Sequence, residues 1–483
     1  MESKRSIILL ADGSKPDVFE ELLANGSLPN IKREIVEPGC FRRAVSAFPS
    51  TTGPAHIPFL TGCLPATCNI PGIRWFDKKL YAKDGHGSSF TFGAHGRYRS
   101  YVGMETFRIN SDMRKDVYTV FEILPKSYSI FNSINRGVGH RNLTRIMRIW
   151  YWYYGHLTDR WRFVDESAVN KMLSLVKRDF EFLFVVFPGI DVYSHITDPR
   201  HDYVIGQYKF LDSAVGRLAG ELKALGKWDD TLLWIVSDHG LSSTHMHFCV
   251  NTFLEERGIK TFYFPLVYRR NCVAANMVSG NGMTHVYFKR RGGWGEPATL
   301  EDINDMYPGL LDELLAEPAA DVIAIRGRDG RIIARTKKGE ARIALDGNNI
   351  SYEVNGADPF GYNFTSKNGR AGLQTHERII LNDTIGSDYP DAPYQLAHIF
   401  TSPRCGDLVI SALPGYDLRL KYEDPEHKAS HGSLHREHML VPVLCNIKLP
   451  EVPMRTVDIF PTYMKLMGHN IPQNIDGISL NYL

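Results

Sequence analysis

Residues 232–240 read Leu-Leu-Trp-Ile-Val-Ser-Asp-His-Gly, an apolar run that ends in an aspartate and a histidine. Two other segments have the same form. Residues 7–12 read Ile-Ile-Leu-Leu-Ala-Asp, and residues 184–191 read Phe-Val-Val-Phe-Pro-Gly-Ile-Asp, with His195 four positions later. Apolar, β-branched runs of this length are typical of buried strands in a parallel sheet. Because the carboxyl ends of parallel strands lie along one edge of the sheet, we expect the polar residues that follow them to meet there.

The order of patterns along the chain predicts an α/β fold. From residue 6 to about residue 250, apolar strand patterns alternate with amphipathic helix patterns, which indicates a mostly parallel central sheet. From about residue 260 to residue 430, the chain instead contains glycine-rich, charged stretches that resemble hairpins. We therefore predict a catalytic core formed by residues 1–260 and 426–483, with residues 261–425 as an inserted or capping α+β lobe.

The composition is that of an ordinary globular protein. Of the 483 residues, 43% are hydrophobic and 23% are charged, and the formal net charge is +2. The chain therefore has no overall attraction for nucleic acid, and no specific nucleic-acid binding is expected. No apolar stretch approaches the roughly 18 residues that a membrane span needs, and the first residues lack a signal-peptide pattern. The seven cysteines are scattered without a CxxC pair, so we predict a cytoplasmic location.

The aspartates and histidines at the strand ends predict a metal centre, because carboxylate and imidazole ligands suit Zn²⁺ or Mn²⁺. A candidate nucleophile lies in residues 48–56, Phe-Pro-Ser-Thr-Thr-Gly-Pro-Ala-His, where Thr52 precedes a Gly-Pro pair and a predicted helix. A threonine in this position could simply cap the helix. Beside a metal centre its alkoxide would be stabilised, and the helix N-terminus would favour an anion. The metal-ligand clusters favour the second interpretation.

The order of these motifs resembles that of a known family. Phe-Pro-x-x-Thr-x-Pro-x-His, Asp-x-x-x-His and Ser-Asp-His-Gly follow Asp12 in the order found in the alkaline phosphatase superfamily. They are most similar to the motifs of type I phosphodiesterases/nucleotide pyrophosphatases. The resemblance covers roughly residues 5–75, 180–245 and 425–465. It implies an alkaline-phosphatase-like three-layer sandwich, two divalent metal ions (zinc, with manganese as the alternative) and Thr52 as the nucleophile.

The resemblance also implies which side chains bind the metals. One set is Asp12, Asp238 and His239, and the other is Asp191, His195 and a late histidine. Residues 430–438, Ser-His-Gly-Ser-Leu-His-Arg-Glu-His, offer three histidines for the last position. His431 is preferred over His435 because His431-Gly432 best matches the family's late His-Gly. His245 and His247 follow the Ser-Asp-His-Gly motif closely but are expected to lie in a loop beside the centre.

The motifs leave the exact reaction open. Thr52 is shared with phosphodiesterases, pyrophosphatases and phosphonoacetate hydrolases, whereas alkaline phosphatases proper have serine. Ala55 stands where the diesterase motif commonly has asparagine, and the family's later phosphate-binding asparagine has no clear counterpart near residues 72–77. Arg74 could replace it as a cationic clamp, or could be a surface charge.

Three functions follow from this pattern. The preferred one is hydrolysis of a phosphodiester or pyrophosphate bond through a phosphothreonine intermediate, with a small phosphodiester or nucleotide-like substrate. The first alternative is a phosphomonoesterase or phosphonate hydrolase on the same centre. The second is an inactive metal-binding interaction protein, which is disfavoured because the nucleophile and at least five ligands are intact.

Residues 141–163 interleave arginines with tryptophans and tyrosines. This composition fits an interfacial helix that contacts a membrane or lipid, or a surface on which a base stacks. It also fits a helix packed under the inserted lobe, with arginine stems covering apolar area, and we favour that interpretation. A lipid contact would imply an amphiphilic substrate, such as a lipid-linked phosphodiester.

Overall fold

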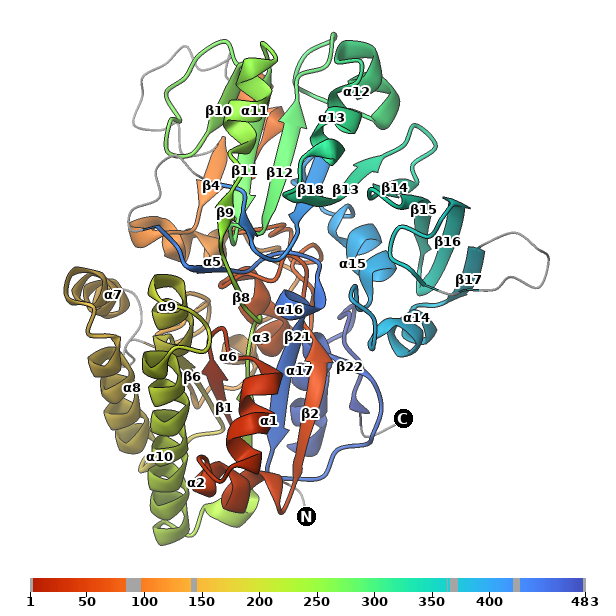
Figure 1. Cartoon of the computed structure of the whole chain (residues 1–483). Coiled ribbons are helices and arrows are strands. Elements are labelled where there is room, and N and C mark those ends of the chain that lie inside the picture. The colour runs from red at the N-terminus through yellow and green to blue at the C-terminus, as the bar shows by residue number, and fades with distance from the viewer. Residues whose placement is uncertain are drawn as a thin grey trace.

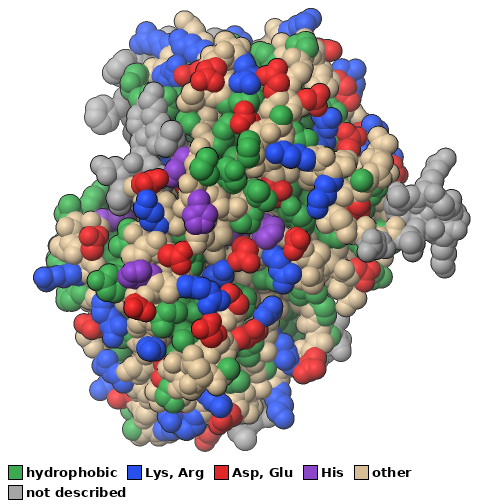
Figure 2. All heavy atoms as spheres, viewed as in Figure 1, with side chains coloured by type: hydrophobic (Ala, Val, Ile, Leu, Met, Phe, Trp, Pro, Cys, Tyr) green, Lys and Arg blue, Asp and Glu red, His purple; other side chains and the backbone are tan. Residues whose placement is uncertain are grey.

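A computed structural model of the chain describes residues 3–83, 97–139, 146–362, 364, 372–419 and 426–480. The chain folds around two large sheets, one of seven strands and one of nine, which form two lobes (Figure 1). The predicted α/β class with a mostly parallel central sheet is confirmed. Basic and acidic side chains are interspersed over the face seen in Figure 2, in keeping with the small net charge.

The first sheet contains β1 (Arg5–Ala11), β2 (Cys40–Val45), β5 (Ser127–Ile130), β6 (Phe182–Phe187), β7 (Thr231–Val236), β21 (Leu440–Cys445) and β22 (Met454–Arg455). Their order is β22-β2-β21-β7-β1-β6-β5. β1 lies at the centre and pairs in parallel with both β6 and β7. Among the described strands of this sheet, β21 alone is antiparallel to its neighbours. The three predicted strands therefore lie side by side, with their carboxyl ends at one edge.

Helices cover both faces of this sheet, which gives three layers. The helices on one face are α1 (Pro16–Ala24), α8 (Trp161–Val176) and α10 (Asp202–Ala224), and those on the other are α3 (Ile57–Thr61), α6 (Val120–Ile123) and α17 (Ile459–Leu466). The ring of Phe182 in β6 lies 5.9 Å from Phe121 of α6 and 5.2 Å from Tyr463 of α17. Because both faces are covered, every residue of β6 and β7 is buried.

The second sheet contains β10 (Thr261–Tyr263), β11 (Ala274–Ser279), β12 (Met283–Phe288), β13 (Ala320–Arg326), β14 (Ile332–Arg335), β15 (Gly339–Asp346), β16 (Asn349–Gly356), β17 (Gly372–His376) and β18 (Leu408–Ala412). Their order is β10-β11-β12-β18-β13-β14-β15-β16-β17, and the pairs are antiparallel apart from β10 with β11. This sheet lies in the predicted α+β lobe, whose bounds of 261–425 stay a prediction.

Helices also cover the two faces of the second sheet. They are α11 (Val250–Glu256), α12 (Leu300–Met306) and α13 (Leu310–Ala316) on one face, and α14 (Glu377–Thr384) and α15 (Ala392–Ile399) on the other. Successive residues of β13 point to opposite faces, so Val322 and Ile323 belong to different hydrophobic clusters. The cluster that contains Val322 also includes Val45 and Leu440 of the first sheet. The two lobes therefore share apolar packing.

The turn between β11 and β12 reaches the edge where β1, β6 and β7 end. It consists of Gly280, Asn281 and Gly282. Gly282 N–H donates to the His431 carbonyl at 2.8 Å, and His431 N–H donates to the Gly280 carbonyl at 3.3 Å. A loop of the second sheet thus holds part of the predicted site.

The remaining elements are short, apart from α7. The helical ones are α2 (Pro29–Ile31), η1 (Lys32–Val36), η2 (Pro54–His56), α4 (Lys78–Lys83), η4 (Gly103–Arg108), α5 (Ile109–Asp112), α7 (Ile146–Thr158), α9 (Gly189–Ile196), η5 (Trp228–Asp230), α16 (Arg436–Met439) and η6 (Thr456–Asp458). The strand pairs are β3 (Arg74–Phe76) with β4 (Tyr98–Ser100), β8 (Ser242–Ser243) with β20 (Ala429–Ser430), and β9 (Met246–His247) with β19 (Tyr416–Asp417). Among the described residues, no helix has the length and apolarity needed to cross a membrane.

Candidate metal centre and active site

Three strand ends bring three buried aspartates together. Asp12 follows β1, Asp191 lies in the first turn of α9 just after β6, and Asp238 follows β7. The register pairs Ala11 with Phe187, and Asp12 N–H donates to the Phe187 carbonyl at 3.1 Å. The three aspartates are 2%, 7% and 0% exposed, respectively. Carboxylates this deeply buried need a charged partner, hydrogen bonds or a metal ion.

The first predicted ligand set is contiguous. His239 Nε2 lies 3.5 Å from Asp12 Oδ1 and 3.5 Å from Asp238 Oδ2. The other oxygen of Asp238 accepts the N–H groups of Gly13, at 3.3 Å, and His239, at 3.2 Å. Main-chain donors therefore hold the Asp238 carboxylate and leave its second oxygen directed toward the imidazoles.

The second predicted set is arranged around Asp191. Because His195 follows it by four residues in α9, both side chains lie on one face of that helix, and His195 Nε2 is 3.3 Å from Asp191 Oδ1. His431 Nε2 lies 3.9 Å from the same oxygen. The Nδ1 atoms of the two histidines contact the carbonyls of Ala429, at 2.7 Å, and Ser50, at 2.9 Å. Donation from Nδ1 leaves each Nε2 as the ligand atom.

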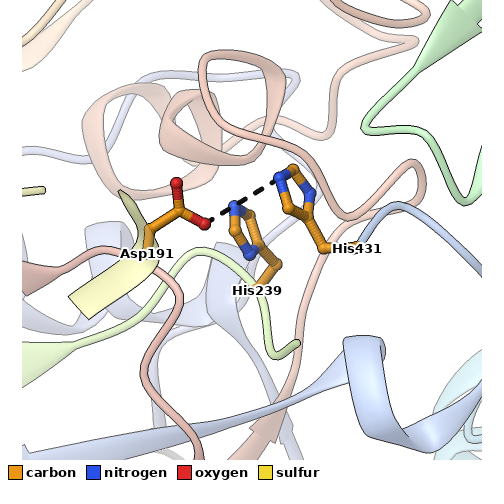
Figure 3. A group of neighbouring side chains, drawn as sticks. All are labelled: Asp191, His239 and His431. Atoms are coloured by element: carbon orange, nitrogen blue, oxygen red, sulfur yellow. Dashed lines mark ion pairs between the residues drawn. The ribbon is translucent and has the colours of Figure 1, made fainter. Parts of the chain in front are cut away.

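The two sets form one continuous site. The rings of His239 and His431 stack with centroids 3.6 Å apart and planes at 9°. Asp191, His239 and His431 point toward one another in Figure 3, and their ligand atoms form one compact group. A second compact group consists of Asp12, His56 and Asp238. His239 thus lies between the two predicted ligand sets. His56, which was not predicted as a site residue, lies with Asp12 and Asp238 of the first set.

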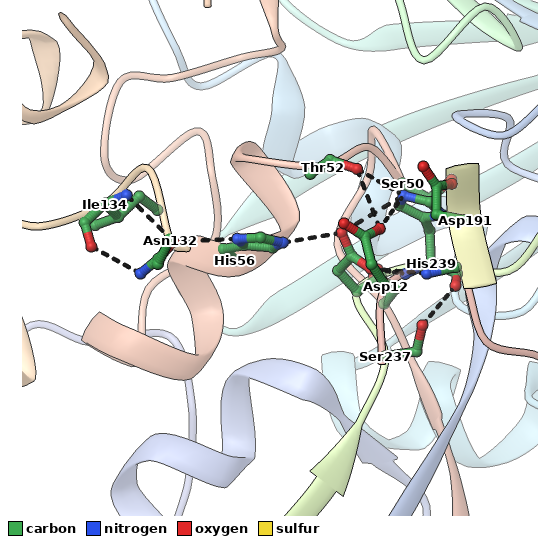
Figure 4. Close-up of polar contacts among 12 residues, drawn as sticks. Asp12, Ser50, Thr52, His56, Asn132, Ile134, Asp191, Ser237 and His239 are labelled. Atoms are coloured by element: carbon green, nitrogen blue, oxygen red, sulfur yellow. Dashed lines mark hydrogen bonds and ion pairs between the residues drawn. The ribbon is translucent and has the colours of Figure 1, made fainter. Parts of the chain in front are cut away.

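Thr52 lies beside these ligands. Its Oγ1 is 3.3 Å from Asp12 Oδ1 and 3.0 Å from His239 Nε2 (Figure 4). The next residue, Gly53, has φ +93° and precedes the helical residues of η2 and α3. Only glycine adopts that φ readily, so this residue allows the sharp entry into the helix that leaves Thr52 half-buried at the centre.

His56 extends the network away from the centre. Its Nε2 lies 3.1 Å from Asp238 Oδ2, and its Nδ1 lies 3.2 Å from Asn132 Oδ1 (Figure 4). Asn132 is fixed in turn, because its amide donates to the Ile134 carbonyl at 2.7 Å. Two buried side chains, those of His56 and Asn132, therefore orient the Asp238 carboxylate.

The other histidines discussed above have different contacts. His435 Nδ1 accepts the Glu437 N–H at 3.3 Å and caps α16, and His438 Nε2 contacts the Ser242 hydroxyl at 2.8 Å. His247 Nε2 contacts Glu426 at 2.8 Å, and His245 is exposed. Of the three late histidines, His431 is the one whose ring lies against His239 and Asp191.

The electrostatics of the site fit a bound cation. Burial, followed by repulsion from Asp238 and Asp191, raises the pKa of Asp12 well above its usual value. Burial and the neighbouring His239 hold the pKa of His431 well below its usual value, so this imidazole is neutral and able to bind metal. Asp191 Oδ1 is buried without a hydrogen-bond partner among the described residues. A divalent ion would satisfy this oxygen and relieve the repulsion between the carboxylates.

A cavity of about 380 Å³ is lined by Asp12, Thr52, Asp191, His195 and His431, and by three arginines, Arg74, Arg148 and Arg419. Arg74 is 8% exposed, so it is buried in the cavity wall and is not a surface charge. It donates to the Ser100 hydroxyl and the Val278 carbonyl, both at 3.0 Å. Burial, followed by repulsion from Arg419, lowers the pKa of Arg74 to about 9.

The basic and aromatic segment supplies another wall of this cavity. Residues 141–145 lie outside the described residues, and residues 146–158 form α7. Arg148 and Trp152 line the cavity. The Phe131 ring lies 5.5 Å from Trp152, so α7 packs against the core lobe. Its opposite face carries four exposed apolar or aromatic side chains, Met147, Trp150, Tyr153 and Leu157.

A family model described as type I phosphodiesterase/nucleotide pyrophosphatase matches residues 6–434. The chain belongs to this family. The predicted family is therefore confirmed, and with it the enzyme class of phosphoric ester hydrolases. The buried aspartates and histidines are the candidate metal-binding groups of this family member. No curated protein matches the chain.

Solved structures show where the fold of this family member recurs. Phosphonoacetate hydrolase from Sinorhizobium meliloti 1021, in complex with phosphonoformate, is 15% identical, with a TM-score of 0.56 over 96% of this chain and 95% of that chain. Murine ectonucleotide pyrophosphatase/phosphodiesterase 5 is 12% identical, with a TM-score of 0.57 over 97% and 96%. An inactive variant of the murine protein, in complex with AMP, is 11% identical, with a TM-score of 0.56 over 97% and 96%. The predicted alkaline-phosphatase-like fold is confirmed.

Three residues near the candidate centre of this family member were not predicted as site residues from the sequence. His56 is in the quoted motif and follows Thr52 by four residues, a spacing that places both at one helix N-terminus. Asn132 had no comparable signal, and Arg148 lies within residues 141–163, for which the sequence did not indicate a role in the cavity wall. They reach the centre through contacts with His56 and Phe131, and these contacts are visible only in the folded chain.

Proposed function

We propose that this protein hydrolyses a phosphodiester or pyrophosphate bond in a small molecule, with Thr52 as the nucleophile. The observation that carries the proposal is the position of Thr52 Oγ1, 3.0 Å from His239 Nε2 and 3.3 Å from Asp12 Oδ1. The hydroxyl also faces the cavity of about 380 Å³, which has room for a small substrate. A hydroxyl beside buried metal-ligand side chains is where an alkoxide nucleophile is stabilised.

The six predicted ligands support a centre of two metal ions. Asp12, Asp238 and His239 would hold one ion, and Asp191, His195 and His431 would hold the other. When bound, divalent ions lower the pKa of a hydroxyl group and neutralise charge on phosphoryl oxygens. We propose zinc because mixed carboxylate and imidazole sets are typical of catalytic zinc, with manganese as the alternative.

The reaction then has two displacements at phosphorus. In the first, the Thr52 hydroxyl loses its proton and Oγ1 forms a bond to phosphorus, while the bond to the leaving oxygen breaks and that oxygen acquires a proton. The product on the protein is a phosphothreonine. In the second, a water oxygen bonds to phosphorus, the bond to Oγ1 breaks, and Thr52 regains its proton. The six ligands would keep the centre in place through both steps.

The walls of the cavity support two finer proposals. Arg74 would hold a substrate oxygen in place of the asparagine that other diesterases use, because its guanidinium is buried in the wall of the same cavity as Thr52. The exposed face of α7, with Trp150 and Tyr153, would contact a lipid surface and thereby admit amphiphilic phosphodiesters. A cytoplasmic location stays a prediction from the cysteines.

A substrate panel tests the function. The compounds are bis(4-nitrophenyl) phosphate, 4-nitrophenyl phosphate and phosphonoacetate, each assayed with and without chelator. We expect turnover of the diester above that of the monoester, loss of turnover on chelation, and recovery with zinc. Thr52→Ala should lower kcat by at least about 10³-fold, as is typical of a lost nucleophile, without loss of zinc binding.

A matched control and the contrary results make this test decisive. Thr51→Ala removes the neighbouring hydroxyl, which forms no hydrogen bond with Asp12 or His239, and should cost less than about tenfold. Preference for the monoester or for phosphonoacetate would support the alternative hydrolases. Inactivity on every compound with zinc bound would support an interaction protein and contradict the proposal.

A further inference from the structure

α7 places the cation of Arg148 inside the active-site cavity. The side chain is 9% exposed, and it lines the cavity that also contains Thr52 and Asp191. Burial lowers the pKa of Arg148 to about 10, although attraction to Asp12 partly offsets the effect. The guanidinium is therefore charged at neutral pH and lies in the space where the substrate would react.

Two contacts fix the guanidinium and leave its outer edge open. Nε donates to the Phe131 carbonyl at 2.9 Å, and Cζ lies 4.0 Å from the centroid of the Trp152 ring. Among the described residues, neither Nη atom has a hydrogen-bond acceptor and no carboxylate forms an ion pair with Arg148. The two Nη atoms are the pair that a carboxylate or phosphate binds with two parallel hydrogen bonds.

The backbone that holds Arg148 is anchored to the metal centre. Phe131 directly follows β5 and has φ +59°, a left-handed conformation that is unfavourable for an aromatic residue. The next residue, Asn132, contacts His56, which contacts Asp238. One short segment after β5 therefore sets both the orientation of a metal ligand and the position of Arg148.

No carboxylate among the described residues forms an ion pair with this cation. Asp12 attracts Arg148, but Asp12 is assigned to a metal ion. A buried, unpaired guanidinium is unfavourable, and an anionic ligand removes that cost.

We propose that Arg148 binds a second anionic group of the substrate, a carboxylate or a further phosphoryl group attached beside the phosphorus that Thr52 attacks. The proposal rests on the proposed function, because it takes the first phosphoryl group to lie at the aspartate and histidine centre. It narrows the preferred substrate from any small phosphodiester to compounds with at least two neighbouring acidic groups.

Equilibrium binding of three phosphonates tests this assignment. Ethylphosphonate, phosphonoacetate and methylenediphosphonate share one phosphonate and differ in the group beside it, which is methyl, carboxylate or a second phosphonate. They are titrated by calorimetry into zinc-loaded protein with the Thr52→Ala substitution, so that turnover does not interfere. Of phosphonoacetate and methylenediphosphonate, the tighter ligand should bind on the order of 10- to 100-fold more tightly than ethylphosphonate. The identity of that ligand shows whether the second group is a carboxylate or a phosphoryl group.

Two further substitutions are made in the Thr52→Ala background. Arg148→Met should reduce the preference to less than about threefold, because methionine fills the volume without the charge. Arg404→Met is the matched control, since Arg404 Cζ lies 4.2 Å from the Trp75 centroid and Nη1 donates to main-chain carbonyls, but the residue does not line the cavity. The control should keep the full preference.

Two results would overturn the assignment in different ways. If ethylphosphonate binds and the preference is absent, or survives Arg148→Met, the phosphoryl site stands and the role of Arg148 is wrong. If no phosphonate binds the zinc-loaded protein, the proposed function fails and the inference fails with it.

Discussion

Replacing His56 with alanine should weaken zinc binding by about 10- to 100-fold, or roughly 1.4 to 2.8 kcal/mol. The residue is 2% exposed, and its nitrogens lie 3.1 Å from Asp238 Oδ2 and 3.2 Å from Asn132 Oδ1. In the variant, main-chain N–H groups still hold the other oxygen of Asp238, but the imidazole that orients Oδ2 is gone. Loss of the partner that orients a metal ligand typically has this effect on metal affinity.

The assay is competition for zinc against a chromophoric chelator, together with the free energy of unfolding measured with excess chelator. His285→Ala is the control, because His285 is also fully buried and lies in β12, where its Nε2 contacts the Pro71 carbonyl at 3.0 Å. It should lower stability but keep zinc affinity within about twofold, as expected for a distant site. Equal zinc affinities in the two variants would refute the role of His56, because general destabilisation would then explain both.

Three other substitutions test the structure independently. Gly280→Ala should lower diester kcat/KM by about tenfold or more, because at φ +66° a Cβ would lie 2.9 Å from His431 Nδ1; wild-type kinetics would contradict this. Burial raises the pKa of Asp321 from 3.8 to about 6, so its stabilising contribution is complete below about pH 4 and is lost as pH rises through 6. Asp321→Asn should therefore gain up to about 3 kcal/mol relative to wild type between pH 4 and pH 7, measured by urea unfolding with chelator, and a constant difference would count against it. Arg455→Ala should cost about 3–5 kcal/mol in the same assay, because it leaves the fully buried Asp391 without its paired guanidinium; a cost below about 1 kcal/mol would be inconsistent with that pairing.

The strand ends of the first lobe could be predicted because their signal is local. β1, β6 and β7 are buried on both faces, so each is a continuous apolar run, and the aspartate that follows lies within four residues of the strand end. The sequence indicated the second sheet only through a change from alternating strand and helix patterns to glycine-rich, charged stretches that resemble hairpins. Its order depends on pairing β12 with β18, which are far apart in the chain, and such pairing has no local pattern.

The choice of the sixth metal ligand shows the same limit of prediction from local sequence. The sequence offers His431, His435 and His438 within a few residues, and motif similarity alone favoured the first. Packing separates them, because His435 caps a helix and His438 contacts Ser242, whereas His431 lies against His239. Similarly, the aromatic and basic composition of residues 141–163 could not show which face of α7 would line the cavity.

The β11–β12 turn has a consequence for protein engineering and for the divergence of relatives. Gly280 and Gly282 exchange main-chain hydrogen bonds with His431, so the tip of one hairpin is a structural support of the catalytic centre. A chimera that exchanges the second lobe for that of another protein would alter the placement of this histidine even if every ligand were retained. Transplanting specificity between relatives would therefore require the hairpin tip to be carried along with the core, as part of the inherited active site.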